Sequence, residues 1–193
     1  MGIFNWVKRL LAIKATTRSQ ATDLQALFGG EVTASLTLPH YQAYPLVTPT
    51  TETELSAYQL HCLLNDQDKQ RLDTLLCQAG FEQIVGSDAP FNGVLHHTSL
   101  QTTVFLQQYA DFAGFCVLLI TNDINLLQQL ITFKAAPPAP WESFPDVDPD
   151  TLGSLQGNLE FWCDAFWRPY WLSLGETERL QYPINWREFS EFH

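Results

Sequence analysis

The chain has 193 residues, of which 46% are hydrophobic and 13% aromatic, enough apolar side chain for a packed core, so a disordered chain is excluded. The longest apolar run, residues 115–120, has the length of a strand, so we expect no transmembrane helix. The formal net charge is −11, and residues 19–193 hold six basic against twenty-one acidic side chains. We therefore expect no direct binding to nucleic acid, whose phosphates repel such a body, and attraction to a basic protein.

Residues 1–20 form the first of two predicted units, with an amphipathic helix over residues 2–14. On a helical wheel Phe4 and Trp6 fall on the apolar side, and Lys8 and Arg9 lie opposite. Such a helix can dock on the core with its basic side against the acidic body. It can also lie in a membrane interface or on a partner protein. The sequence leaves these alternatives open.

The compartment is predicted from the N-terminal residues and the redox state from the cysteines. The first residues lack the uninterrupted apolar core and cleavage site of a secretory signal, so we expect a cytoplasmic protein. The four cysteines fall in apolar contexts without close pairing, which favours buried, reduced thiols over disulfides or metal ligands. They are Cys62, Cys77, Cys116 and Cys163.

Residues 21–98 predict helices and strands in mixed order, from apolar periodicity and turn residues. The expected elements are a helical turn over 23–28, a strand over 32–38, an extended connector over 39–51, a helix from 51 or 53 to 63, a helix that begins at Asn65–Asp66 and is closed by Gly80, and strands over 81–85 and 94–97.

The clearest strand is expected at residues 115–121, where a continuous apolar run suits a central position buried on both faces. Asn122–Asp123 then predicts the start of a helix. Before this strand, residues 99–112 fit a helix or a strand, and we favour a strand through residue 107. After the helix, the prolines of residues 135–149 predict a long extended connector.

Residues 150–192 hold four of the six tryptophans and predict an aromatic-rich helical pair. The first helix is expected from residue 151, with Gly153 and Gly157 on a face that another element could approach closely. Pro169 should kink or end it. Ser173 and Glu176 form a capping-box pattern that predicts a second helix.

Together these elements predict an α+β fold for residues 21–193, treated as a single domain. We expect a mixed sheet of about four to five strands covered by helices, with the aromatic-rich helical pair at the C-terminal end.

The sequence offers no recognisable catalytic or cofactor motif: it lacks phosphate-binding loops, a dinucleotide fingerprint and a nucleophile elbow. Asp146, Asp148 and Asp150 match the first three positions of a calcium loop. Thr151 and Gly157 stand where that loop needs its glycine and its closing acid, which argues against calcium. We expect no metal, cofactor or catalytic residue.

Acidic and aromatic residues interleave at the C-terminal end, a combination that recognises Arg- or Lys-rich surfaces by charge pairing and cation–π contact. The predicted partner-binding residues are Glu176, Glu178, Trp186, Glu188, Phe189, Glu191, Asp146, Asp148 and Asp150. We therefore predict a non-enzymatic acidic module that neutralises or regulates a basic partner, as an immunity protein or inhibitor does.

Other interpretations stay open. The aromatic rings can simply close the core with the acids as its solvated rim, and acidity can serve solubility alone, as in many bacterial proteins. A second function class is a peripheral membrane or scaffold protein that docks through Phe4, Trp6, Lys8 and Arg9. A third is a small cytoplasmic enzyme that uses Asp123 with His96 or His97.

Overall fold

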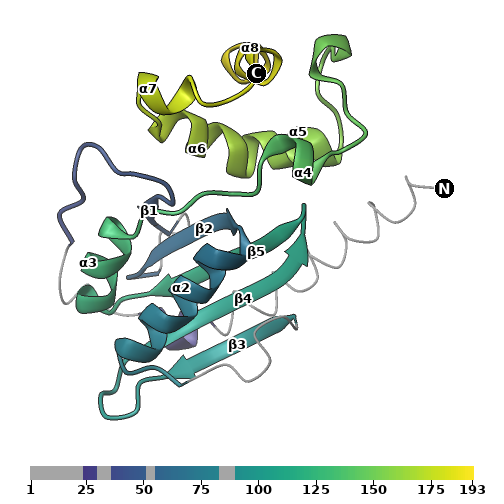
Figure 1. Cartoon of the computed structure of the whole chain (residues 1–193). Helices are drawn as coiled ribbons and strands as arrows, with labels where there is room; N and C mark the ends of the chain where they lie inside the picture. The colour runs from purple at the N-terminus through teal and green to yellow at the C-terminus, as the bar shows by residue number, and fades with distance from the viewer. Residues whose placement is uncertain (1–23, 30–35, 51–54, 83–89) are drawn as a thin grey trace.

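The computed structural model describes residues 24–29, 36–50, 55–82 and 90–193 (Figure 1). The predictions for the N-terminal helix, including Phe4, Trp6, Lys8 and Arg9, lie outside the described residues, as does most of the strand expected at 81–85. The predicted helical turn is confirmed at residues 24–28, whereas residues 36–38 of the expected strand are irregular.

The centre of the fold is a five-stranded antiparallel sheet in the order β1-β2-β5-β4-β3. The predicted α+β class with a helix-covered sheet of about four to five strands is confirmed, but the paired strands are all antiparallel, so the expectation of a mixed sheet is wrong. The strands are β1 (Val47–Pro49), β2 (Tyr58–Leu64), β3 (Phe91–His96), β4 (Thr103–Asp111) and β5 (Gly114–Thr121).

Strand β5 occupies the middle of the sheet, as its apolar run predicts. Leu119 pairs with Leu60 of β2 on one side and with Leu106 of β4 on the other, and all three side chains are buried. Ile120, which points to the opposite face, is also buried. Both faces of this strand therefore lie in the core.

Helices α2 (Asp66–Gln78) and α3 (Ile124–Thr132) cover one face of the sheet, toward the viewer in Figure 1. Leu72 and Leu76 of α2 enter the core there. On the opposite face the helical residues 24–28 place Leu24 and Phe28 against Phe105 and Ile120 in a smaller cluster. The sequence predicts both larger helices correctly, including the caps Asn65 and Asp123.

The predicted helix over residues 51–63 is wrong from residue 58 onward, where the chain forms β2. Its apolar residues fit a helical period, but Cys62 and Leu63 face opposite sides of the sheet and both are fully buried. Pairing along the whole length of β5 supplies this burial, so tertiary contacts override the local pattern.

After α3 the chain leaves the sheet and forms a group of short helices, which we call the C-terminal layer (residues 140–193). Figure 1 shows it beyond the β1–β2 edge of the sheet. Its elements are α4 (Pro140–Ser143), η1 (Pro149–Thr151), α5 (Asn158–Trp162), the π-helical segment η2 (Cys163–Trp167), α6 (Arg168–Ser173), α7 (Glu176–Arg179) and α8 (Ile184–Phe192).

The aromatic-rich helical region is therefore confirmed, but its boundaries differ from the prediction. The helix expected from residue 151 begins at Asn158, after a left-handed Gly157. No close approach occurs at Gly153 or Gly157, because a Cβ atom at either position would meet nothing within 4 Å. The second helix is capped by Gly175, whose N–H donates to the Glu178 carboxylate at 2.7 Å, and not by Ser173.

Pro169 does not end its helix, which continues to Ser173. The irregularity that a proline imposes takes the form of η2, where the Arg168 N–H donates to the Cys163 carbonyl five residues back. This wider turn brings residues five apart onto one side. Trp162 and Trp167 consequently stack at 5.4 Å with an interplanar angle of 11°, and Trp171 continues the stack.

Among the described residues, no helix combines the length and the apolar composition that crossing a membrane requires.

Candidate partner-binding surface

The interior of the C-terminal layer is aromatic and fixed in place. Trp162, Trp167 and Trp171 are fully buried, and Tyr182 packs edge-on against the last two. The Tyr170 and Tyr182 hydroxyls lie 2.9 Å apart. Burial, followed by this hydrogen bond, raises the pKa of Tyr182 well above its usual value, so the hydroxyl stays neutral.

Helix α8 is attached to this interior by its inner side. Trp186 and Phe189 are each 4% exposed, and their rings pack at 5.2 Å. The Trp167 Nε1–H donates to the Ser190 hydroxyl at 2.7 Å, and that hydroxyl donates to the Trp186 carbonyl. Trp186 and Phe189, both predicted as partner-binding residues, therefore anchor the helix and present no ring to a partner.

The predicted acidic residues all lie in the C-terminal layer and all are exposed. Glu176 and Glu178 belong to α7, and Glu188 and Glu191 to α8. Asp146, Asp148 and Asp150 lie at or just before η1, which is adjacent to α8.

Two of these carboxylates have local structural roles. Asp148 caps η1 by accepting from the Asp150 N–H at 3.1 Å. Glu178 accepts from Gly175. Glu176, Glu188 and Glu191 are available to solvent or to a partner, because they are exposed and their carboxylates are not needed for a helix cap.

Negative charge is concentrated in this layer. Residues 140–193 hold ten acidic side chains against three arginines. Arg179 lies over the Trp171 ring at 5.2 Å, and Arg168 makes a loose, exposed pair with Asp164 at 3.8 Å. In the sheet region, by contrast, Lys69 pairs with Asp73, so part of the charge there is neutralised locally.

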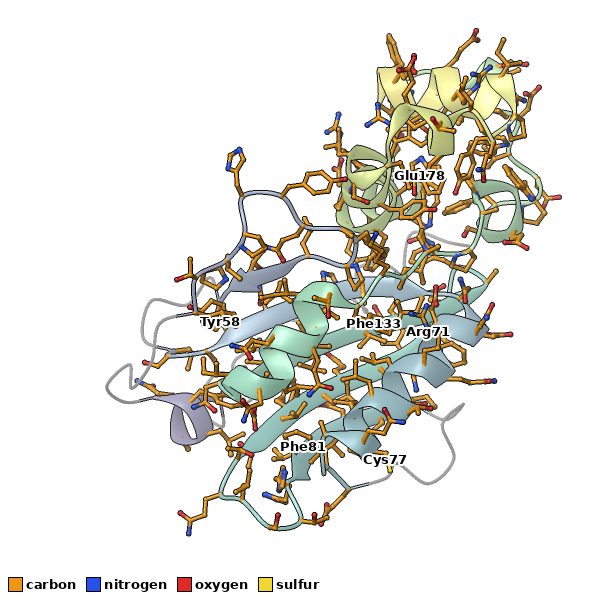
Figure 2. The ribbon with its side chains drawn as sticks, turned by 60° about the vertical axis from the view of Figure 1, so that its left-hand side comes forward. Tyr58, Arg71, Cys77, Phe81, Phe133 and Glu178 are labelled. Carbon is orange, nitrogen blue, oxygen red and sulfur yellow. The ribbon has the colours of Figure 1, made fainter. Side chains whose placement is uncertain are left out.

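Exposed apolar side chains accompany these acids, which the sequence analysis missed. Ile184 is 64% exposed and Phe192 81%. Leu172 and Leu180 are similarly exposed. The helical spacing of Ile184 from the buried Trp186 and Phe189 could have placed it on the outer side, had the helix boundaries been known. Figure 2 shows Glu178 in this layer, far from Cys77 and Phe81 at the other end of the molecule.

The residues of the enzymatic alternative are held in separate local structures. Asp123 caps α3 by accepting from the Leu126 N–H at 3.0 Å. His97 Nδ1 accepts from the N–H groups of Ser99 and Leu100, and its ring packs edge-on against Phe81. His96 directly precedes His97 in the sequence and points to the opposite face of the sheet. Asp123 Oδ1 and His97 Nδ1 are thus each engaged in a local hydrogen bond to the backbone.

Within the residues that the structure describes, no three His, Cys, Asp or Glu side chains are placed to hold a metal ion. The four cysteines are free thiols: Cys62, Cys116 and Cys163 are buried and Cys77 is exposed, contrary to the expectation that all four are buried. Burial raises the pKa of Cys163 to about 11.

Comparison with protein-family models, with curated proteins and with solved structures found no match to this chain.

Proposed function

We propose that this protein is a non-enzymatic binding module that occupies a basic surface of a partner protein through its C-terminal layer, in the manner of an immunity protein or inhibitor. The observation that carries the proposal is the coincidence of ten carboxylates, three arginines and several exposed apolar side chains on one rigid layer. Protein interfaces combine such apolar contacts with a charged rim, and complementary charge steers association.

The rigidity of the layer supports the same function. The tryptophan stack and the Trp167–Ser190 hydrogen bond fix the helices before a partner arrives. A surface that is already ordered loses less conformational entropy on binding, so its modest apolar area contributes more to affinity.

The test compares two double variants that remove the same charge. E176Q/E188Q removes one carboxylate each from α7 and α8. D66N/E82Q removes two exposed carboxylates outside the C-terminal layer. The partner is captured from native lysate with the wild-type protein, identified by mass spectrometry, and titrated against all three proteins by calorimetry.

We expect a partner with an excess of Lys and Arg. Its Kd should rise by about tenfold or more between about 50 mM and 300 mM NaCl, because salt screens exposed charges. E176Q/E188Q should weaken binding by about threefold to tenfold, and D66N/E82Q by less than about twofold. A partner without basic excess, or equal losses from the two pairs, contradicts the proposal.

A cytoplasmic location is part of this proposal. It is supported by the four free thiols, since buried unpaired cysteines are typical of a reducing compartment. Fractionation of the source cells tests it with an antibody against the protein. Recovery in the secreted or the membrane fraction contradicts it.

A further inference from the structure

The outer side of α8 is a single stripe of apolar and acidic side chains. Trp186 and Phe189 point into the layer, whereas Ile184, Glu188, Glu191 and Phe192 are exposed. These four residues stand at positions i, i+4, i+7 and i+8, which share one side of an α-helix. The stripe therefore begins and ends with an apolar side chain and carries two carboxylates between them.

The dimensions of the stripe suit a second helix. Eight residues of α-helix span about 12 Å, so the Ile184 and Phe192 side chains are separated by about two turns. A helix laid along α8 with cations three or four residues apart could pair with Glu188 and Glu191. Its apolar residues would then meet Ile184, one turn before Glu188, and Phe192, which directly follows Glu191.

The negative charge of the α8 stripe limits which molecules can dock on it. A second copy of α8 would bring Glu188 and Glu191 against like charges, which is unfavourable, and a nucleic acid would bring phosphates. The neighbouring element η1 adds Asp148 and Asp150 to the negative field. The occupant must therefore be cationic, and the exposed Ile184 and Phe192 require that it be apolar on the same side.

We infer that the outer side of α8 is the docking site for a cationic amphipathic helix of the partner protein. This inference rests on the proposed function and names the element that makes the contact and the kind of structure that it receives. Glu188 and Glu191 pair with Lys or Arg, and Ile184 and Phe192 cover the apolar residues of the incoming helix.

The probe is a fluorescein-labelled peptide of lysine and leucine, about 14 residues long, with all leucines on one helical side. A peptide of the same composition in scrambled order is the peptide control. Fluorescence anisotropy measures binding to the full-length protein at about 50 mM and about 300 mM NaCl. E188Q/E191Q is compared with E160Q/D164N, which removes two exposed carboxylates of the same layer from α5 and η2.

We expect the patterned peptide to bind at least about fivefold more tightly than the scrambled one. E188Q/E191Q should weaken its binding by about fivefold to tenfold, and E160Q/D164N by less than about twofold. I184S/F192S should remove the preference for the patterned peptide. Both side chains are exposed, so this variant is expected to fold normally.

Equal losses from the two carboxylate pairs would show that the field of the whole layer attracts the peptide. That result overturns the α8 site and leaves the proposed function standing. Equal binding of the patterned and scrambled peptides overturns helix recognition, and so does an unchanged preference in I184S/F192S. If the peptide fails to bind wild-type protein, or binds it without dependence on salt, both the α8 site and the proposed function fail.

Discussion

The Tyr44 hydroxyl completes the backbone hydrogen bonding of Leu63. It accepts from the Leu63 N–H at 2.7 Å and donates to the Leu63 carbonyl at 3.0 Å. Strand β1 pairs with β2 only as far as Leu60, so Leu63 has no strand partner on that side. The Tyr44 side chain thus takes the place of a strand partner at Leu63 and satisfies two buried polar groups.

Substitution of Tyr44 by Phe should therefore destabilise the fold although the ring is kept. The Leu63 N–H would be left buried without its acceptor, which costs about 1–3 kcal/mol. Urea unfolding at neutral pH measures the loss. Tyr41→Phe serves as the control, because Tyr41 is exposed and its hydroxyl donates to the Ser173 carbonyl where water can replace it. This variant should change stability by less than about 0.5 kcal/mol. Equal effects of the two variants would contradict the role of the hydroxyl.

Tyr44 also predicts how stability changes at high pH. Burial raises its pKa well above the ordinary value of 10.0. Below about pH 10 the Tyr44 hydroxyl keeps its proton in both the folded and the unfolded chain. Above about pH 10 the unfolded chain releases this proton, whereas the folded chain retains it. The free energy of unfolding should therefore fall as pH rises above about 10. Urea unfolding at several alkaline pH values should show a shallower fall for Tyr44→Phe than for the wild type.

The parts of the fold that sequence predicts well are those in which one local signal decides. The apolar run of β5 and the caps Asn65 and Asp123 are of this kind, because burial on both faces and a side-chain bond to the next turn are local demands. No single local signal decides the structure of strand β2. Its residues are equally consistent with a helix until β5 is present to pair with it.

The candidate surface likewise has features that the sequence predicts and features that it does not. The exposure of the acids follows from their charge, and the sequence places all of them in one segment. The burial of Trp186 and Phe189, however, depends on Trp167 reaching Ser190 across 23 positions, which no local pattern contains. The π-helical segment could not be predicted from the sequence for a related reason. Its register is defined by the hydrogen bond from the Arg168 N–H to the Cys163 carbonyl, which no local sequence pattern indicates.

Gly80 illustrates a position where backbone conformation and packing both exclude a side chain. Its φ is +93°, and a Cβ atom there would lie 2.5 Å from His97 Nε2. Gly80→Ala should cost about 1–3 kcal/mol, since the left-handed backbone and the His97 ring are both affected. Gly153→Ala is the matched control, because nothing lies within 4 Å of that position. Thermal and urea unfolding should show a larger loss of stability for Gly80→Ala than for Gly153→Ala. A Gly80→Ala variant as stable as the wild type would refute the explanation.

Ser190 holds α8 to the tryptophan stack, so its removal should weaken that attachment. Ser190→Ala leaves the Trp167 Nε1–H without its acceptor, at a cost of about 1–3 kcal/mol. Ser154→Ala, at an exposed position, should change stability by less than about 0.5 kcal/mol. Hydrogen exchange should show faster exchange in α8 of the Ser190 variant. Unchanged exchange there would mean that Trp186 and Phe189 are sufficient anchors.

Cys77 should react with alkylating reagents far faster than the other three cysteines. It lies on α2 (Figure 2) and is exposed, whereas Cys62, Cys116 and Cys163 are buried. Burial also raises the pKa of the Cys62 and Cys163 thiols, which lowers the fraction of the reactive thiolate. Iodoacetamide at pH 8 should add one label quickly, and peptide mapping should locate it at Cys77. The Cys77→Ser variant should take up no fast label, and rapid labelling of Cys163 would show that the C-terminal layer opens readily in solution.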